Sequence, residues 1–146
     1  GAVGLMATKG AQLQGAGEII AVETVESRQQ LAREYGADHV VDFADSDPVA
    51  EIMDLTDDRG VDVAIEALGA DQTLQDCIKV TKPGGTVSNV GYHGDGEFRR
   101  IPREEWGVGM AEIDIVTDLC PGGRLRIRNG TAGQFSHGAQ ACRRIG

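Results

Sequence analysis

The glycines at the start of the chain have the spacing of a loop that binds phosphate groups. The chain opens with Gly1-Ala2-Val3-Gly4, which matches the last two glycines of the pattern G-x-G-x-x-G. In that pattern one glycine lets the backbone approach a pyrophosphate, and the last one lets the following helix pack closely on a strand. A helix that begins here also directs its free N–H groups and the positive end of its dipole toward a phosphate. Gly1, Ala2, Val3 and Gly4 are therefore predicted to contact a dinucleotide.

An acidic residue follows these glycines at the distance expected for a ribose contact. Glu23 lies nineteen positions after Gly4, at the end of an apolar run that we interpret as a strand. A carboxylate there accepts hydrogen bonds from the ribose diol of NAD and repels the 2′-phosphate of NADP. The four residues after Glu23 include no arginine that could receive that phosphate. The pattern favours NAD over NADP; the alternative is an ordinary solvent-exposed acid at a strand end.

Two further segments with small residues follow predicted strands. Glu66-Ala67-Leu68-Gly69 comes after one strand, and Gly91-Tyr92-His93-Gly94 comes after the next. Ligands of open α/β sheets bind outside the carboxyl ends of the strands. We therefore predict nicotinamide or ribose contacts for four residues: Ala67, Leu68, Gly91 and Tyr92. Glycines of ordinary turns are the alternative and fit these segments equally well.

The sequence contains no pattern typical of a metal site or of a catalytic group. The three histidines and three cysteines are scattered, and no pair of cysteines has C-x-x-C spacing. His93 is interpreted as a polar loop residue and Cys77 as a packing residue. The G-x-S-x-G and P-loop motifs are both absent. No catalytic and no metal-binding residue is predicted in this chain.

Strands and helices are predicted to alternate along most of the chain. Apolar periodicity predicts helices near 3–13, 27–35, 48–56 and 71–81, and short apolar runs predict strands near 18–23, 39–42, 61–65 and 86–90. Asp47 is the expected N-cap of the third helix, with Pro48 at its first position. Lys82 to Gly85 is the expected turn before the last strand. Continuous apolar strands predict an α/β fold with a doubly wound, mostly parallel sheet that is covered on both faces.

Length and composition fit one soluble domain. The chain has 146 residues and a formal net charge of −9, which is room for about one domain with an acidic surface. This charge and the absence of a basic cluster argue against nucleic acid as a partner. No apolar run is long enough to span a membrane, and the cytoplasm is the expected location. Residues 129–146 follow no helical or strand period, so they are predicted to be a loose terminus or a segment foreign to the domain.

Six short segments carry a resemblance to a known family. They are Gly1 to Ala7, Tyr35 to Ala37, Gly60 to Asp62, Lys82 to Thr86, Ile101 to Gly107 and Leu119 to Arg126. In this order they resemble the zinc-dependent medium-chain alcohol dehydrogenases, and in particular the tetrameric secondary alcohol dehydrogenases of bacteria. The last two segments are the most specific. This chain has Glu23-Thr24-Val25 at the place where the resemblance implies Gly-Ser-Arg in NADP-using members of that branch. It has Phe43 where those members are expected to have Tyr.

The resemblance has consequences for fold and function. It implies that residues 1–128 are part of a Rossmann-like dinucleotide-binding domain whose first strand precedes residue 1. It implies a parent enzyme, a homo-oligomer, that transfers a hydride between a small alcohol or carbonyl compound and a nicotinamide cofactor, with NAD preferred. Zinc would be held by a catalytic domain outside this chain, so the chain alone is expected to be inactive. The alternative is a catalytically silent dinucleotide-binding or oligomerisation module.

Overall fold

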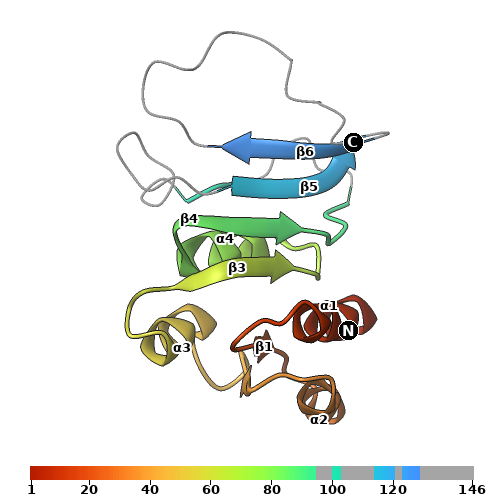
Figure 1. Cartoon of the computed structure of the whole chain (residues 1–146), viewed down its shortest axis with the longest axis vertical. Helices are drawn as coiled ribbons and strands as arrows, with labels where there is room; N and C mark the ends of the chain where they lie inside the picture. Colours follow the sequence, from red (N-terminus) through yellow and green to blue (C-terminus); the bar gives the residue numbers. More distant parts are fainter. Residues whose placement is uncertain (95–99, 103–113, 121–122, 129–146) are drawn as a thin grey trace, which may run out of the picture. The chain divides into compact units, whose positions relative to one another are not determined.

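The computed structural model describes residues 1–94, 100–102, 114–120 and 123–128. Contacts divide the chain into two compact units, Gly1–Arg59 and Gly60–Gly146. The strands form two sheets (Figure 1): β1 and β2 make a parallel pair, and β3 to β6 make a four-stranded sheet in the order β3-β4-β5-β6. The predicted α/β class is confirmed. Among the described residues, neither β1 nor β2 is hydrogen-bonded to a strand of the four-stranded sheet.

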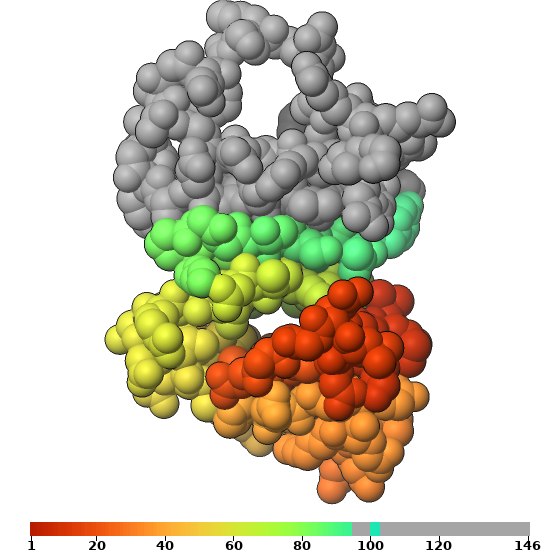
Figure 2. Space-filling view, viewed as in Figure 1, coloured from red at the N-terminus to blue at the C-terminus, as the bar shows by residue number. Residues whose placement is uncertain are grey.

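The first unit alternates helices with two short strands. Its elements are α1 (Ala2–Leu13), β1 (Ile20–Val22), α2 (Glu26–Glu34), β2 (His39–Val41) and α3 (Pro48–Leu55). A small core of Ile19, Ala32 and Ala37 lies between α1 and α2, and Leu5 and Ala11 pack against it. The atoms of α1 and α2 form one continuous surface in Figure 2. These contacts hold the start of α1 near the end of β1.

Two local predictions for this unit have different outcomes. Asp47 is the N-cap of α3, because its Oδ1 accepts a hydrogen bond from the Val49 amide at 3.0 Å, and Pro48 opens the helix as predicted. The apolar face that indicated α1 is exposed, with Val3, Met6 and Leu13 each more than half accessible. The helix is correct, but its packed side is the one that carries Leu5 and Ala11.

The second unit is a sheet with one helix against it. Its elements are β3 (Val61–Glu66), α4 (Asp71–Val80), β4 (Thr81–Asn89), β5 (Asp114–Cys120) and β6 (Gly123–Arg128). Strands β3, β4 and β5 are parallel, and β6 runs antiparallel to β5. Helix α4 packs on β3 and β4 (Figure 1). Its core consists of Ala64, Leu74, Ile78, Val80 and Val87.

The structure corrects two expectations about the strands. β4 begins at Thr81 rather than Thr86. Residues 82–85, which were expected to form a turn, instead form an irregular part of the strand where its register with β3 shifts and Gly84 adopts a φ of +76°. β5 and β6 lie where no element was predicted. On β3, Ala64 and Glu66 are buried, whereas Val63 and Ile65 are exposed. No helix in the described ranges could cross a membrane. Residues 129–146 lie outside those ranges.

Candidate cofactor-binding site

In the first unit, Glu23 lies at the carboxyl end of β1, beside the start of α1. Its amide donates to the Val41 carbonyl at 3.1 Å, which continues the ladder beyond the last strand residue. Its Oε2 accepts a hydrogen bond from the amino group of Gly1 at 2.9 Å. Its Oε1 accepts from the amides of Thr24 and Val25 at 3.0 and 3.1 Å. The structure therefore brings together the two features that the sequence analysis paired, the first glycine of α1 and the acid after β1.

These contacts keep Glu23 ionised. Burial acts to raise the pKa of Glu23, but hydrogen bonds from the Gly1 amino group and the Val25 amide outweigh burial and lower the pKa below its ordinary value. The Gly1 amino group also contributes its charge here. A negative carboxylate near a helix N-terminus has the chemistry that a ribose diol requires.

A second acid and an amide extend this edge of the β1–β2 pair. Asp42 follows β2, and Nε2 of Gln29 donates both to its Oδ2 at 2.7 Å and to the Glu23 carbonyl at 2.9 Å. A hydrogen bond from the Ala44 amide, followed by one from the Thr24 hydroxyl, lowers the pKa of Asp42. Two carboxylates thus remain negative at adjacent strand ends. The sequence analysis missed Asp42 and Gln29, although Asp42 also ends a predicted strand.

An arginine also lies near Glu23. The Nη1 atom of Arg28 is 3.8 Å from Glu23 Oε2, and the Arg28 side chain is half exposed. The sequence argument for NAD considered only the four residues after Glu23, and Arg28 is the fifth. Arg28 lies in the first turn of α2. Because side chains on a helix point back toward its N-terminus, the Arg28 side chain extends toward the carboxyl end of β1. An arginine therefore does lie beside the acid on which the argument for NAD depends.

The glycines at the start of α1 leave open space. A Cβ atom built at Gly1 or Gly4 would meet no atom within 4 Å. The close packing of Gly4 on a strand that the fingerprint predicts is therefore not found among the described residues. Ala2 and Val3 form the first turn of α1 and are exposed. A pyrophosphate could approach this helix start without meeting side chains at either glycine.

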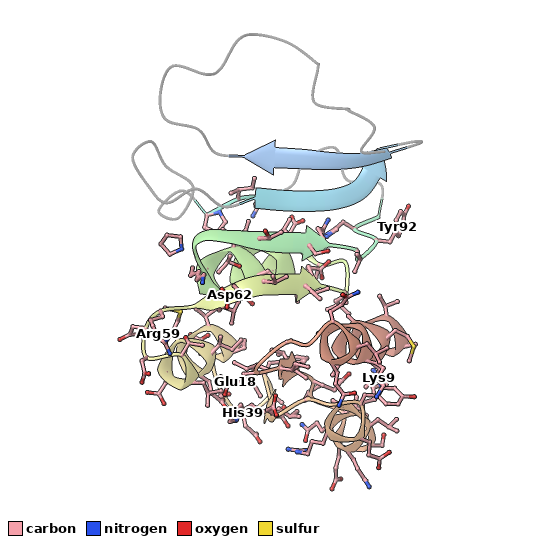
Figure 3. All side chains as sticks on the ribbon, viewed as in Figure 1. Lys9, Glu18, His39, Arg59, Asp62 and Tyr92 are labelled. Atoms are coloured by element: carbon pink, nitrogen blue, oxygen red, sulfur yellow. The ribbon has the colours of Figure 1, made fainter. Side chains whose placement is uncertain are left out.

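In the second unit, the remaining predicted residues lie in two loops at the carboxyl ends of neighbouring parallel strands. Ala67 and Leu68 follow β3, and Gly91 and Tyr92 follow β4, its parallel neighbour, so both loops leave the same edge. The Leu68 and Tyr92 side chains are 70% and 74% exposed. In Figure 3 the Tyr92 side chain points away from the sheet. The structure thus joins these four residues in one surface region of the second unit.

A buried glutamate connects the two loops. The Glu66 side chain is inaccessible to solvent, and its Oε1 accepts hydrogen bonds from the Leu68 amide at 2.9 Å, the Gly69 amide at 2.8 Å and the Thr73 hydroxyl at 2.7 Å. The Glu66 carbonyl accepts from the amides of Val90 and Gly91 at 2.9 and 3.1 Å. One residue therefore binds main-chain groups of both loops.

Glu66 also faces a buried histidine. Nε2 of His93 is 3.2 Å from Glu66 Oε2 and 2.7 Å from Asn89 Oδ1, and the His93 side chain is almost fully buried. Both neighbours are oxygen acceptors, so Nε2 carries a hydrogen atom. The interpretation of His93 as an ordinary polar loop residue is incomplete, because its burial depends on contacts with β3 that the sequence pattern does not contain.

Glu66 is charged despite its burial. Burial acts to raise the pKa of Glu66, but hydrogen bonds from the Gly69 amide and the Thr73 hydroxyl outweigh it and lower the pKa below the ordinary value. Burial, and after it the Glu66 charge, raises the pKa of Cys77 on α4 to about 12. Cys77 is therefore an unreactive thiol, in agreement with its interpretation as a packing residue.

The two loops pack backbone against backbone. A Cβ atom at Gly91 would lie within 3.0 Å of Glu66 Oε2 and of the Gly69 backbone, and a Cβ atom at Gly69 would overlap the Tyr92 carbonyl. Gly69 also has a φ of +93°, which side chains rarely adopt. Glycine at both positions is a steric requirement of this junction.

No metal site accompanies these groups. Within the residues that the structure describes, no three His, Cys, Asp or Glu side chains lie close enough to hold a metal ion. His137 and Cys142, like Trp106, lie outside the described ranges.

Relatives of known activity match most of this chain. It is 49% identical over 127 residues to an NADP-dependent isopropanol dehydrogenase of Thermoanaerobacter brockii, covering 87% of this chain and 36% of that protein. It is 44% identical over 128 residues to an alcohol dehydrogenase of Cupriavidus necator, covering 88% of this chain and 34% of that protein. The chain thus spans about a third of the length of these curated relatives.

Solved structures agree with the sequence matches. Benzyl alcohol dehydrogenase from Acinetobacter calcoaceticus superposes with a TM-score of 0.67 at 38% identity, over 71% of this chain and 28% of that one. Alcohol dehydrogenase TADH from Thermus sp. ATN1 superposes with a TM-score of 0.66 at 32% identity, over 76% and 34% of the two chains. The sequence family described as "Zinc-binding dehydrogenase" matches residues 2–123. The chain therefore belongs to the family of zinc-binding dehydrogenases.

Proposed function

We propose that this chain is the NAD(H)-binding part of a zinc-type alcohol dehydrogenase. The observation that carries the proposal is the position of the Glu23 carboxylate at the carboxyl end of β1, where its Oε1 accepts hydrogen bonds from the amides of Thr24 and Val25. A pyrophosphate at the start of α1 and a ribose diol on Glu23 would use the helix N-terminus and this carboxylate together. For the second unit taken by itself, we propose that the two loops after β3 and β4 contact a nicotinamide or a ribose.

The preference for NAD rests on charge. Glu23 and Asp42 are both negative, and either would repel a 2′-phosphate. The Thermoanaerobacter brockii relative is named for its use of NADP, and Arg28 could favour a 2′-phosphate. Glu23 is held by three N–H groups and is less exposed than Arg28, so we give its charge the larger weight.

A titration of the purified chain with NADH and with NADPH tests this proposal. Trp106 is the single tryptophan, and energy transfer from it to the reduced nicotinamide reports binding. NADH is expected to bind more tightly than NADPH, and Glu23→Gln is expected to remove most of that difference. Glu34→Gln, on an exposed face of α2, is the matched control and should change neither affinity. Failure of a folded chain to bind either cofactor would refute the proposal.

Arg28 provides a second arm of the same experiment. If its guanidinium receives a 2′-phosphate once Glu23 is neutral, the double variant Glu23→Gln/Arg28→Ala should lose the NADPH affinity that Glu23→Gln gains. An unchanged NADPH affinity in the double variant would show that Arg28 takes no part.

For the whole protein, we propose hydride transfer between a small alcohol or carbonyl compound and the nicotinamide, in a cytoplasmic homo-oligomer. The family matches and the names of the relatives support the reaction. The bound nicotinamide supplies the hydride chemistry. The described residues of this chain bind and orient that cofactor, and no step is assigned to zinc because they contain no ligand set for it. Alcohol oxidation by the whole protein and size-exclusion chromatography are the direct tests.

A further inference from the structure

Stability alone does not explain why the Glu66 and His93 side chains are buried together. Both side chains are buried, at 0% and 1% exposure, in a small sheet with one helix against it. Removing two charged or polar groups from water is expensive, and well-packed apolar residues of similar volume are often at least as stabilising as a buried ion pair. The pair therefore calls for an explanation in what it holds in place.

The groups that Glu66 holds are main-chain atoms of the two loops. Its carboxylate binds the amides of Leu68 and Gly69, and its carbonyl binds the amides of Val90 and Gly91. His93, two residues beyond Gly91, closes the arrangement through Oε2 of the same carboxylate. Every contact of Glu66 with a loop is made beneath the surface, whereas Leu68 and Tyr92 extend outward from those loops.

The loops after β3 and β4 are packed so closely against each other that neither can move independently. Gly69 and Gly91 meet so closely that neither can carry a Cβ atom without displacement of backbone or of the Glu66 carboxylate. A change at Glu66 is therefore transmitted directly to the backbone positions of both loops. Loops held in this way present preorganised main-chain groups to a ligand, which reduces the ordering cost of binding.

We infer that Glu66 is a positioning residue that fixes the nicotinamide-binding surface, through its hydrogen bonds to the β3 loop and its pairing with His93 in the β4 loop. This inference rests on the proposed function, because it requires the loops after β3 and β4 to receive the nicotinamide end of the cofactor. Glu66 itself does not touch the cofactor. Its role is to set where the peptide groups of residues 67–69 and 91–92 lie.

Two ligands separate this role from a general effect on folding. ADP-ribose carries the adenosine, pyrophosphate and both riboses but no nicotinamide, whereas NADH carries the nicotinamide as well. Glu66→Gln keeps the size of the side chain and places an NH₂ group or an uncharged oxygen against the amides of Leu68 and Gly69. NADH affinity is expected to fall about tenfold or more, the effect of losing one charge-assisted hydrogen bond. ADP-ribose affinity is expected to stay within about twofold of the wild type.

The chain offers a matched control pair. Glu18 and His39 form the same kind of contact, Oε1 to Nε2 at 2.9 Å, but on the surface, with side chains 55% and 40% exposed (Figure 3). Glu18→Gln should leave both affinities unchanged, because exposed ion pairs contribute little and this one holds no loop. Circular dichroism of each variant establishes that it is folded before any titration.

A second variant covers the possibility that Glu66→Gln does not fold. His93→Gln leaves the three hydrogen bonds to Glu66 Oε1 in place and removes the imidazole contacts with Glu66 Oε2 and Asn89 Oδ1, so it is the milder change for Glu66. It is expected to show the same selective loss of NADH affinity at a smaller magnitude.

The possible outcomes separate the two proposals. Loss of NADH affinity with ADP-ribose affinity retained supports the positioning role. Equal loss of both, or no loss of either, in a folded variant overturns it. A wild-type chain that binds ADP-ribose as tightly as NADH also overturns it, while it leaves the adenosine side of the proposed function intact. A wild-type chain that binds neither ligand refutes the proposed function itself, and the positioning role falls with it.

Discussion

Replacing Gly91 with alanine should strongly destabilise the second unit. The added Cβ atom would lie within 3.0 Å of both Glu66 Oε2 and the Gly69 backbone nitrogen, where ordinary contacts are 3.4–4 Å. Gly91 does not have a positive φ, so the effect is steric and not a matter of backbone conformation. Overpacking of a tight site typically costs about 1–3 kcal/mol. Displacement of the carboxylate weakens a charge-assisted hydrogen bond, which adds about 1.5 kcal/mol or more.

The total expected loss is about 3 kcal/mol in the free energy of unfolding. Urea unfolding followed by far-ultraviolet circular dichroism measures it as a lower midpoint at similar slope. Gly10→Ala is the matched control, because Gly10 lies inside α1 and a Cβ atom there meets nothing within 4 Å. That substitution should raise the stability by about 0.5–1 kcal/mol through helix propensity. A Gly91→Ala variant within about 0.5 kcal/mol of the wild type would refute the packing argument.

Three further predictions concern single groups. Because burial and the Glu66 charge raise the pKa of Cys77 to about 12, iodoacetamide at pH 8 should leave Cys77 unmodified in the native chain and alkylate it after denaturation, as peptide mass spectrometry would show. Because the pKa of Glu66 is lower in the folded state than its ordinary value of 4.5, ionised Glu66 stabilises the fold at pH values above 4.5, and this stabilisation is lost as the pH falls through the folded-state pKa. The stability of a Glu66→Gln variant should therefore decrease less steeply on acidification than that of the wild type. Asp47→Ala should cost about 1 kcal/mol in thermal or urea unfolding, because α3 loses its N-cap, and an unchanged midpoint would contradict that role.

The sequence was sufficient where the determining interactions are local. The alternation of helices and strands and the cap at Asp47 both follow from residue types at fixed short spacings, and the structure contains them. The start of β4 was predicted too late, because Lys82 to Gly85 resemble a turn and only pairing with β3 shows that they belong to the strand.

The parts of the site that were missed depend on contacts between distant segments. Glu66 was noted only as the residue before Ala67, since nothing in its own neighbourhood indicates that Val90, Gly91 and His93 will enclose it. Arg28 was passed over because linear distance from Glu23 was used where helical geometry decides the approach. Burial of charge and the return of a helix toward a strand end are tertiary properties, and residue spacing alone does not encode them.

The exposed outer side of β3 has a consequence for how the chain behaves in solution. β3 is the end strand of its sheet and carries Val63 and Ile65, which are 55% and 40% exposed. An end strand with apolar side chains is a template for pairing between molecules. The net charge of −9 opposes such encounters, and salt or acid weakens that repulsion. We therefore expect turbidity that rises with protein concentration, salt and acidity, and a clear solution under the same conditions for Ile65→Lys.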